Sequence, residues 1–485
     1  MPMRFYLFMG MMTGISFISA SQADDRPAAS AAARKADKKS PAGAAAPAKI
    51  DDALRSYPSL PGAVCAIPER LMKNAPFDVA RIYAPVPHGE NAAPLYLDAL
   101  YEFVPNEMES CISPEESAIR GPAARERVER TSKVQFAATP EASPDERAAI
   151  VAEYEMAFEK LASAQHRKRC VFETGIGIDA RLPHALAARQ VVRLLDLRVD
   201  AHVREGAIAA ALDDVDMALR LSRDLRPRGS LIPQLISVAL DSTILTSLVP
   251  TILGAPRLEV AQCDRLLDMI SRHEREGGDV LVEGFRMEYL LLREMLYRIE
   301  NEEDDMPDFP DTTEVADEEL ADLTPQDFAD ELDALNRFFR PLVNPDKRTI
   351  REWDELLSEQ QPLAESMKLL GKLLPTVSQF IEAACRDRTR LGATRCLVAL
   401  RRWQCQRGTE LPQDLLTVCK AAGMKSVPID EYSESGEPLR STMIDGEFVI
   451  YSVARDKNDD QAQFDWDFGK YNGDWIFRLP AAPKP

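Results

Sequence analysis

Residues 183–225 read PHALAARQVVRLLDLRVDAHVREGAIAAALDDVDMALRLSRDL and show the fold class most clearly. Apolar side chains recur every three or four residues on both sides of Glu205-Gly206, which is the spacing of one helix face. The pattern predicts two amphipathic helices, over 183–204 and 207–225, joined by a short glycine turn. We expect the core of this helical stack to include Leu194, Leu197, Leu212, Leu219 and Leu235.

Helical periodicity continues along most of the chain. Ser143-Pro144-Asp145-Glu146 places Ser at an N-cap, Pro at the first helical position and Glu three residues after the cap, a strong helix-start signal. Further helices are predicted over 91–103, 143–169, 231–252, 258–274, 279–299 and from 324 to 407. The predicted fold is mainly α, an irregular antiparallel helical array with a small C-terminal α+β module.

The last hundred residues change pattern. After the helix come a Pro-marked bend and a turn, then a predicted pair of strands that includes the apolar segment 448–452, a carboxylate-rich loop and a last predicted strand over 474–477. Residues 448–452 alternate, so one face can pack on the 386–405 helix while the other meets solvent. Ile476 and Leu479 would complete the apolar layer. The sequence thus predicts a helical domain at 51–380 and an α+β module at 381–485.

This module resembles the C-terminal half of the major pseudopilin of type II secretion systems, over about 385–479. The resemblance rests on Leu411-Pro412, Pro428-Ile429-Asp430, Gly436-Glu437-Pro438 and the acidic loop. The sequence departs from the family pattern at Ala454, where the family has Gly, and at Glu431-Tyr432, where the family has Trp-Gly. The N-terminal prepilin peptidase motif and its hydrophobic helix are also missing, which argues against the usual assembly into a filament.

The pseudopilin resemblance implies a calcium ion in the carboxylate-rich loop. Calcium takes six to eight oxygen ligands, mostly carboxylates and carbonyls. The candidate ligands are Asp456, Asn458, Asp459 and Asp460, with Asp465, Asp467 and Asp474 close in sequence. Two interpretations stay open: a calcium site, or an acidic hairpin loop without an ion.

Two further resemblances concern the helical part. The hairpin at 183–225 resembles those of tetratricopeptide-type proteins, although no consistent period repeats it. The region 88–300 also resembles a group of uncharacterised exported bacterial proteins. The shared segments are Asn91-Ala92-Ala93, Cys170-Val171-Phe172 and Leu182-Pro183-His184. Both resemblances imply a helical architecture, and neither implies an activity.

The N-terminus has the features of a secretory signal peptide over residues 1–23. Arg4 precedes an apolar stretch at 5–18, and Ser21-Gln22-Ala23 supplies small residues for cleavage after Ala23. An uncleaved membrane anchor is the alternative. No later uninterrupted apolar run reaches the roughly 18 residues of a membrane helix. We therefore expect a mature chain without a transmembrane helix, located in the periplasm or outside the cell.

Charge and composition limit the partners. The formal net charge of -20 argues against nucleic acid, because phosphates need Lys and Arg to displace their counterions. Calcium and basic protein partners remain compatible with this net charge.

Residues 24–50 carry almost no large apolar side chain, so they predict a disordered tether. The acidic, proline-containing stretch 300–322 predicts an exposed loop, either a solvated linker or a calcium or partner site.

Eight cysteines would permit four disulfides in an exported chain. Cys385 and Cys396 on one helix would lie roughly 16 Å apart, too far for a bond. Cys405 and Cys419 flank the turn at 408–412 and could face each other across a helix pair. The alternative is that most of the cysteines are buried free thiols.

Catalytic signals are weak. No HExxH, GxSxG, Walker or GxGxxG motif appears, and the five histidines are scattered: His88, His166, His184, His202 and His273. His166 and Cys170 stand at i and i+4, as two metal ligands or as packing residues. We expect an exported, non-catalytic protein that binds a protein partner at the cell envelope. The alternative is an exported hydrolase, which predicts carboxylates or histidines with perturbed pKa values in a cleft.

Overall fold

The computed structural model describes residues 67–87, 89–103, 139, 142–172, 176, 182–301, 324–344, 348–368, 371, 376–408, 410–465 and 472–480. All of them belong to one compact unit, residues 58–309 and 313–485. The other unit, residues 1–57 and 310–312, lies outside the described residues. The predicted signal peptide, the tether and nearly all of the acidic stretch 300–322 also lie outside them.

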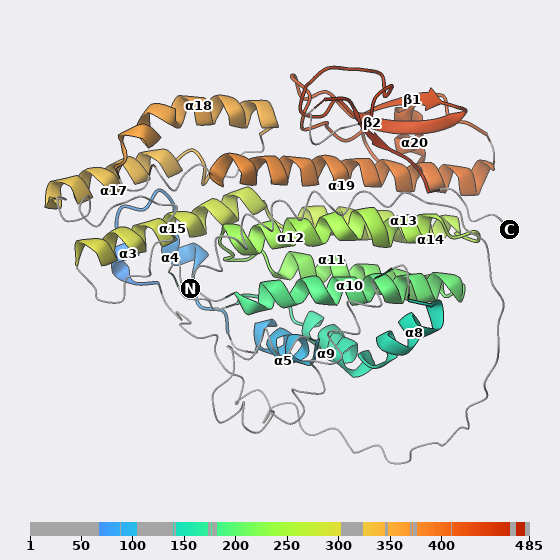
Figure 1. Cartoon of the computed structure of the whole chain (residues 1–485), viewed down its shortest axis with the longest axis horizontal. Coiled ribbons are helices and arrows are strands. Elements are labelled where there is room, and N and C mark those ends of the chain that lie inside the picture. Colours follow the sequence, from blue (N-terminus) through green and yellow to red (C-terminus); the bar gives the residue numbers. More distant parts are fainter. Residues whose placement is uncertain are drawn as a thin grey trace, which may run out of the picture. The chain divides into compact units, whose positions relative to one another are not determined.

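The described residues form a mainly α fold with a small C-terminal sheet, which confirms the predicted fold class (Figure 1). The first helices are α3 (Glu69–Met72), α4 (Val79–Ile82), α5 (Ala93–Phe103), α8 (Pro144–Ala152), α9 (Glu155–Gln165), α10 (Pro183–Arg204) and α11 (Ile208–Asp224). Then follow α12 (Leu231–Thr243), η2 (Ile244–Leu248), α13 (Val249–Leu253), α14 (Val260–Glu276) and α15 (Val280–Glu300). The last are α17 (Pro325–Phe339), α18 (Ile350–Ser366), α19 (Thr376–Arg407) and α20 (Leu415–Ala421).

The hairpin of α10 and α11 forms where the sequence predicts it. Gly206 adopts a φ of 75°, a left-handed conformation that glycine reaches without steric cost, and so ends α10. Leu194, Leu197, Leu212 and Leu219 are buried, as predicted. The fifth predicted core residue, Leu235, is only partly buried and packs with a different group of side chains.

The predicted helix over 143–169 is broken in two, so that prediction is wrong. Ser143 and Glu146 form the expected capping box of α8. However, α8 ends at Ala152, and a turn at Glu153-Tyr154 precedes α9. The turn places Tyr154 in the core, where its ring stacks on Phe103 with 5.6 Å between centroids. Burial of this aromatic ring favours the break over a continuous helix.

Helices α12, η2 and α13 form one continuous run, Leu231–Leu253. Among the described residues this is the one helix long and apolar enough to cross a membrane by length and composition. Gln234 and Asp241 interrupt this run, so no continuous apolar stretch of membrane-helix length is visible in the sequence. Both of these polar side chains are fully buried within the fold. The one-turn π-helix η2 ends two residues before Pro250, which has no amide hydrogen to donate.

Helix α19 joins the helical array to the C-terminal module (Figure 1). It packs against α12, α14 and α15 of the array, and against α20 and strand β2 of the module. Glycines allow close approach on both sides: a Cβ at Gly284 of α15 would meet the Phe380 ring at 2.8 Å, and one at Gly392 would meet Pro428 at 2.9 Å. The predicted domain boundary at 380/381 falls inside this helix.

The C-terminal sheet is antiparallel, with strand order β1-β2-β3. Its strands are β1 (Arg440–Ile444), β2 (Glu447–Ser452) and β3 (Trp475–Phe477), in the predicted order. Asp445 and Gly446 connect β1 and β2 with φ values of 51° and 84°, as a tight hairpin turn requires.

The two faces of β2 are both covered. Ile450 and Phe448 pack toward α19, as predicted. The opposite face was expected to meet solvent, and this is wrong: Val449 and Tyr451 are buried under Ala462 of the following loop. Ile476 also belongs to this second face, whereas Leu479 packs on the α19 side.

We predict that Leu212→Ala lowers the free energy of unfolding by roughly 2–5 kcal/mol, because Leu212 is 1% exposed in the array core and its removal leaves a cavity. Urea unfolding measures the effect. Met156→Ala is the control, because Met156 is 68% exposed and should change stability by no more than about 0.5 kcal/mol. Equal effects of the two changes would contradict the placement of Leu212.

Candidate functional site

The carboxylate-rich loop after β2 folds back over the sheet, and its carboxylates hold it there. Asp456 accepts hydrogen bonds from the amides of Asn458 (3.0 Å) and Gly473 (2.8 Å). Asp459 accepts from the amide of Gln461 (3.0 Å) and from the Tyr451 hydroxyl (3.2 Å). The predicted metal ligands therefore serve, first of all, as acceptors for the loop's own amides.

This loop carries unusual backbone geometry. Ala454, Lys457, Gln461 and Ala462 all have φ values between 52° and 60°, in the left-handed region. Such conformations are costly for residues with a side chain, so the surrounding contacts must hold them. The carboxylate hydrogen bonds are the contacts available for that purpose, and they explain why an acidic sequence can form a compact loop.

Asp474, just before β3, is the most unusual carboxylate of the module. It is fully buried, and its Oδ2 accepts a hydrogen bond from the Ala462 amide at 2.7 Å. Its Oδ1 is buried with no hydrogen-bond partner among the described residues. Burial raises the pKa of Asp474 to about 6, and the nearby charges of Asp459, Asp460 and Asp456 add to the increase. A proton, a cation or a water molecule can serve as the partner of Oδ1.

The predicted calcium ligands do not form a ready-made cage. Among the described residues, no group of three or more His, Cys, Asp or Glu is arranged to hold a metal ion. Asn458 donates from Nδ2 to Asp460 at 2.7 Å, so its amide nitrogen turns toward that carboxylate. Asp467 lies outside the described residues. Each oxygen of Asp456 accepts one hydrogen bond and keeps a second lone pair for an ion. Asp459 has less capacity, because its Oδ1 accepts two hydrogen bonds and its Oδ2 lies 3.4 Å from Arg440 Nε.

A second buried carboxylate, that of Asp430, links the Pro-marked bend to the sheet through hydrogen bonds. Its Oδ1 accepts from the Ser452 hydroxyl at 2.7 Å and from the Tyr432 amide, and its Oδ2 accepts from the Val453 amide at 3.0 Å. Burial raises the pKa of Asp430, while these hydrogen bonds oppose the increase. The role of Asp430 is thus to fix the end of β2.

The helical array contains a buried polar network that sequence reasoning missed. Arg226 forms an ion pair with Asp241 and donates to the Ser237 hydroxyl at 2.8 Å. The His273 ring lies 3.1 Å from Asp241 through Nε2 and 3.1 Å from the Leu219 carbonyl through Nδ1. Burial alone would raise the pKa of Asp241, but His273 and Arg226 lower it to about 2. The network joins α11, α12 and α14.

Asp387 of α19 extends this network. Burial raises the pKa of Asp387 to about 8, and the nearby charge of Asp241 adds to the increase. This shift favours the neutral form of the carboxyl group. Arg226, Asp241, His273 and Asp387 are between 0% and 7% exposed. The network lies in the core and not at the surface, so it is suited to fixing helix packing.

The remaining histidines do not form the pairs considered from sequence. His166 and Cys170 share no helix, because α9 ends at Gln165 and Cys170 is buried in the extended segment that follows. His184 stacks on Phe172, and burial lowers its pKa to about 3. His202 lies at the other end of α10, as expected, with its Nε2 3.5 Å from Asp214. His88 lies outside the described residues.

The cysteines pair differently from the sequence prediction. Cys419 of α20 faces Cys396 of α19, with 3.8 Å between the sulfurs, and not Cys405. Cys405 instead donates to the Leu258 carbonyl at 3.1 Å. Burial raises the pKa of Cys263 to about 12, and nearby Cys405 adds to the increase. Cys65 and Cys111 lie outside the described residues.

Comparison of the chain with protein-family models, with curated proteins and with solved structures gave no match in any of the three.

We predict that Asp474 destabilises the fold at neutral pH. Its folded pKa of about 6 exceeds the unfolded value, so protonation favours the folded state and stability rises as pH falls from 7 to 5. The Asp474→Asn variant should not show this increase in stability between pH 7 and pH 5. Urea unfolding at both pH values, with a chelator present, measures it. Asp445→Asn, at an exposed turn, is the control and should keep the wild-type pH dependence. An unchanged pH dependence in Asp474→Asn would contradict the prediction.

Proposed function

We propose that this is an exported, non-catalytic helical protein whose C-terminal module binds a protein partner at the cell envelope. The helical array serves as the scaffold and α19 holds the module on it. The resemblance to exported bacterial proteins and the signal-peptide features of residues 1–23 support export. The resemblance to pseudopilins supports an α+β module made for protein contact.

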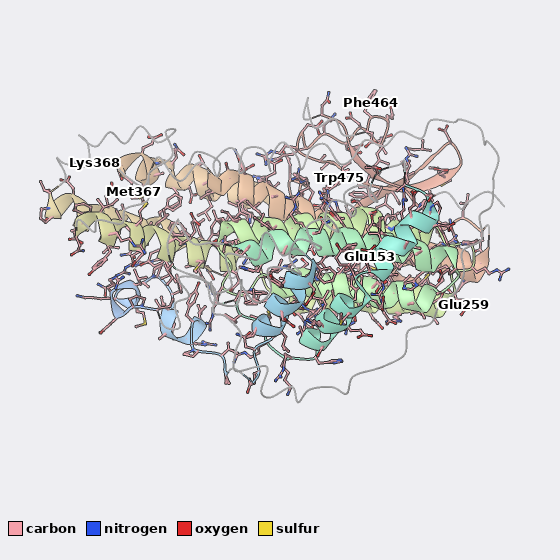
Figure 2. The ribbon with its side chains drawn as sticks, turned by 60° about the horizontal axis from the view of Figure 1, so that its bottom comes forward. Glu153, Glu259, Met367, Lys368, Phe464 and Trp475 are labelled. Atoms are coloured by element: carbon pink, nitrogen blue, oxygen red, sulfur yellow. The ribbon has the colours of Figure 1, made fainter. Side chains whose placement is uncertain are left out.

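One observation carries the binding part of the proposal. Seven large apolar side chains are exposed among the described residues, and five of them belong to the C-terminal module: Leu411, Leu416, Ile429, Met443 and Phe464. Phe464 stands at the outer edge of the module, 65% exposed (Figure 2). Exposed apolar side chains concentrated on one small module are typical of a protein contact surface. Acidic side chains of the same module, such as Asp460, favour a partner that combines apolar and basic residues.

The hydrolase alternative gains no support from the groups with perturbed pKa values. Catalysis needs such groups where a substrate can reach them. Asp241 and Asp387 are instead enclosed by α11, α12, α14 and α19. We therefore retain the binding function as the proposal.

The second part of the proposal is that calcium binds the module and stabilises it. The proposed ligands are Asp456, Asn458, Asp459 and Asp460. The buried Oδ1 of Asp474, which has no hydrogen-bond partner among the described residues, supports a cation beside these carboxylates. A cation there would relieve the repulsion from Asp459, Asp460 and Asp456, which adds to the effect of burial on the pKa of Asp474. The amide hydrogen bonds to Asp456 would remain, with the ion held by the free lone pairs of that carboxylate.

The binding proposal predicts that exposed apolar side chains of the module are required for partner capture. Ile429→Ser with Phe464→Ser should abolish capture of a defined protein from envelope extracts by the immobilised chain. Met156→Ser, which removes an equally exposed apolar side chain from the array, should leave capture unchanged. The readout is the amount of that one protein retained, relative to the unchanged chain. Equal retention by both variants would overturn the proposal.

The calcium proposal predicts that thermal unfolding of the whole protein shifts upward with added calcium, because an ion that binds only the folded state stabilises it by mass action. Titration calorimetry should give uptake of one ion. Asp459→Asn should weaken that uptake, and Asp445→Asn should not. Identical melting curves with calcium and with chelator, together with no calorimetric uptake, would leave an acidic hairpin loop without an ion.

A further inference from the structure

Two thiols on different helices meet in the contact between α19 and α20. Cys396 lies on α19 and Cys419 on α20, 23 residues apart in the chain, and their sulfurs are 3.8 Å apart. Both side chains are fully buried in apolar surroundings. Each sulfur is the other's hydrogen-bond partner. We propose that Cys396 and Cys419 are a disulfide-forming pair that covalently fastens the C-terminal module to α19.

The distance is compatible with this bond. A disulfide needs about 2 Å between the sulfurs, so the pair must close by roughly 1.8 Å. Rotation about the Cα–Cβ bonds can supply most of that movement, and α20 is a short helix of 7 residues at the edge of the fold. The neighbours of the pair are apolar side chains such as Leu415 and Leu397, which a disulfide does not disturb.

The chemistry of the pair also suits thiol exchange. The hydrogen bond from Cys396 lowers the pKa of Cys419 although burial opposes this, and the charge of Arg395 lowers it further. The same contact and burial raise the pKa of Cys396. Cys419 is therefore the sulfur that more readily becomes a thiolate, which is the attacking form.

The oxidant is a small-molecule or protein disulfide. The Cys419 thiolate attacks one sulfur of that disulfide and releases one thiol, which leaves a mixed disulfide on Cys419. Cys396 then loses its proton, attacks the Cys419 sulfur and releases the second thiol. Two protein thiols are oxidised and one external disulfide is reduced to two thiols. Because the pair is buried, the exchange proceeds during folding or when α20 moves away from α19.

The bond would restrict the module in a defined way. It closes a loop that contains the turn at 408–412 and the start of α20, and so limits the freedom of the unfolded chain. It also keeps α20 attached to α19 when the contacts around the pair open, until the disulfide is reduced. The proposal holds wherever the protein is located, and an oxidising compartment would make the bond persistent.

Peptide mapping tests the proposal directly, because trypsin places the three cysteines of this region on separate peptides: 396–401, 403–407 and 408–420. The reduced full chain is refolded with reduced and oxidised glutathione, blocked with N-ethylmaleimide and digested. The expected result is peptide 396–401 joined to peptide 408–420, released by a reductant, with two fewer free thiols per chain. Cys419→Ser should abolish the joined species, and Cys170→Ser should preserve it.

Two results would overturn the proposal. One is recovery of both peptides carrying N-ethylmaleimide after oxidation, which would show that the thiols stay free. The other is peptide 408–420 joined to peptide 403–407, which would show that Cys405 is the partner of Cys419.

Discussion

The constraint on which the structure depends is that α19 must be buried on two sides at once. The array covers one side through α12, α14 and α15, and the module covers the other through α20 and β2. At the positions of closest contact, a helix placed in this way has little room for large side chains. It uses small residues instead, such as Ala393, Cys396 and Ala399, all of which are buried. Gly392 goes further and lets the Pro428 ring approach at a distance that no Cβ would permit.

Buried charged side chains also hold these helices together. Arg226, Asp241 and His273 lie where α11, α12 and α14 meet, and Asp387 brings α19 to the same point. Apolar surfaces alone would allow these helices to slide or rotate with little penalty. A buried ion pair is costly to separate, because either partner left alone would be an unpaired charge in the core. We interpret the network as the element that fixes the register of the helices, while the apolar contacts supply most of the stability.

Sequence patterns predicted the features that depend on neighbours in the chain. The hairpin of α10 and α11, the capping box at Ser143 and the strand order of the module all follow from local spacing and turn chemistry. Features that depend on distant partners were missed. Arg226 and His273 stand 47 residues apart, and no local pattern indicates that they meet. The alternating pattern of β2 could not predict whether its second face meets solvent or the loop around Ala462. The rotation of α19 about its axis decides that Cys419 faces Cys396 and not Cys405, and the sequence does not show that rotation.

The burial of α19 on two sides also sets the order in which parts of the chain can fold as the chain is made. The array residues precede α19 and can collapse onto its first side as soon as it emerges. The second side, with Ala399 and Leu400, stays uncovered until residues 411–479 have followed. During that interval the chain displays a helix with an apolar stripe open to water, which is the kind of intermediate that chaperones recognise and that aggregates when they are absent.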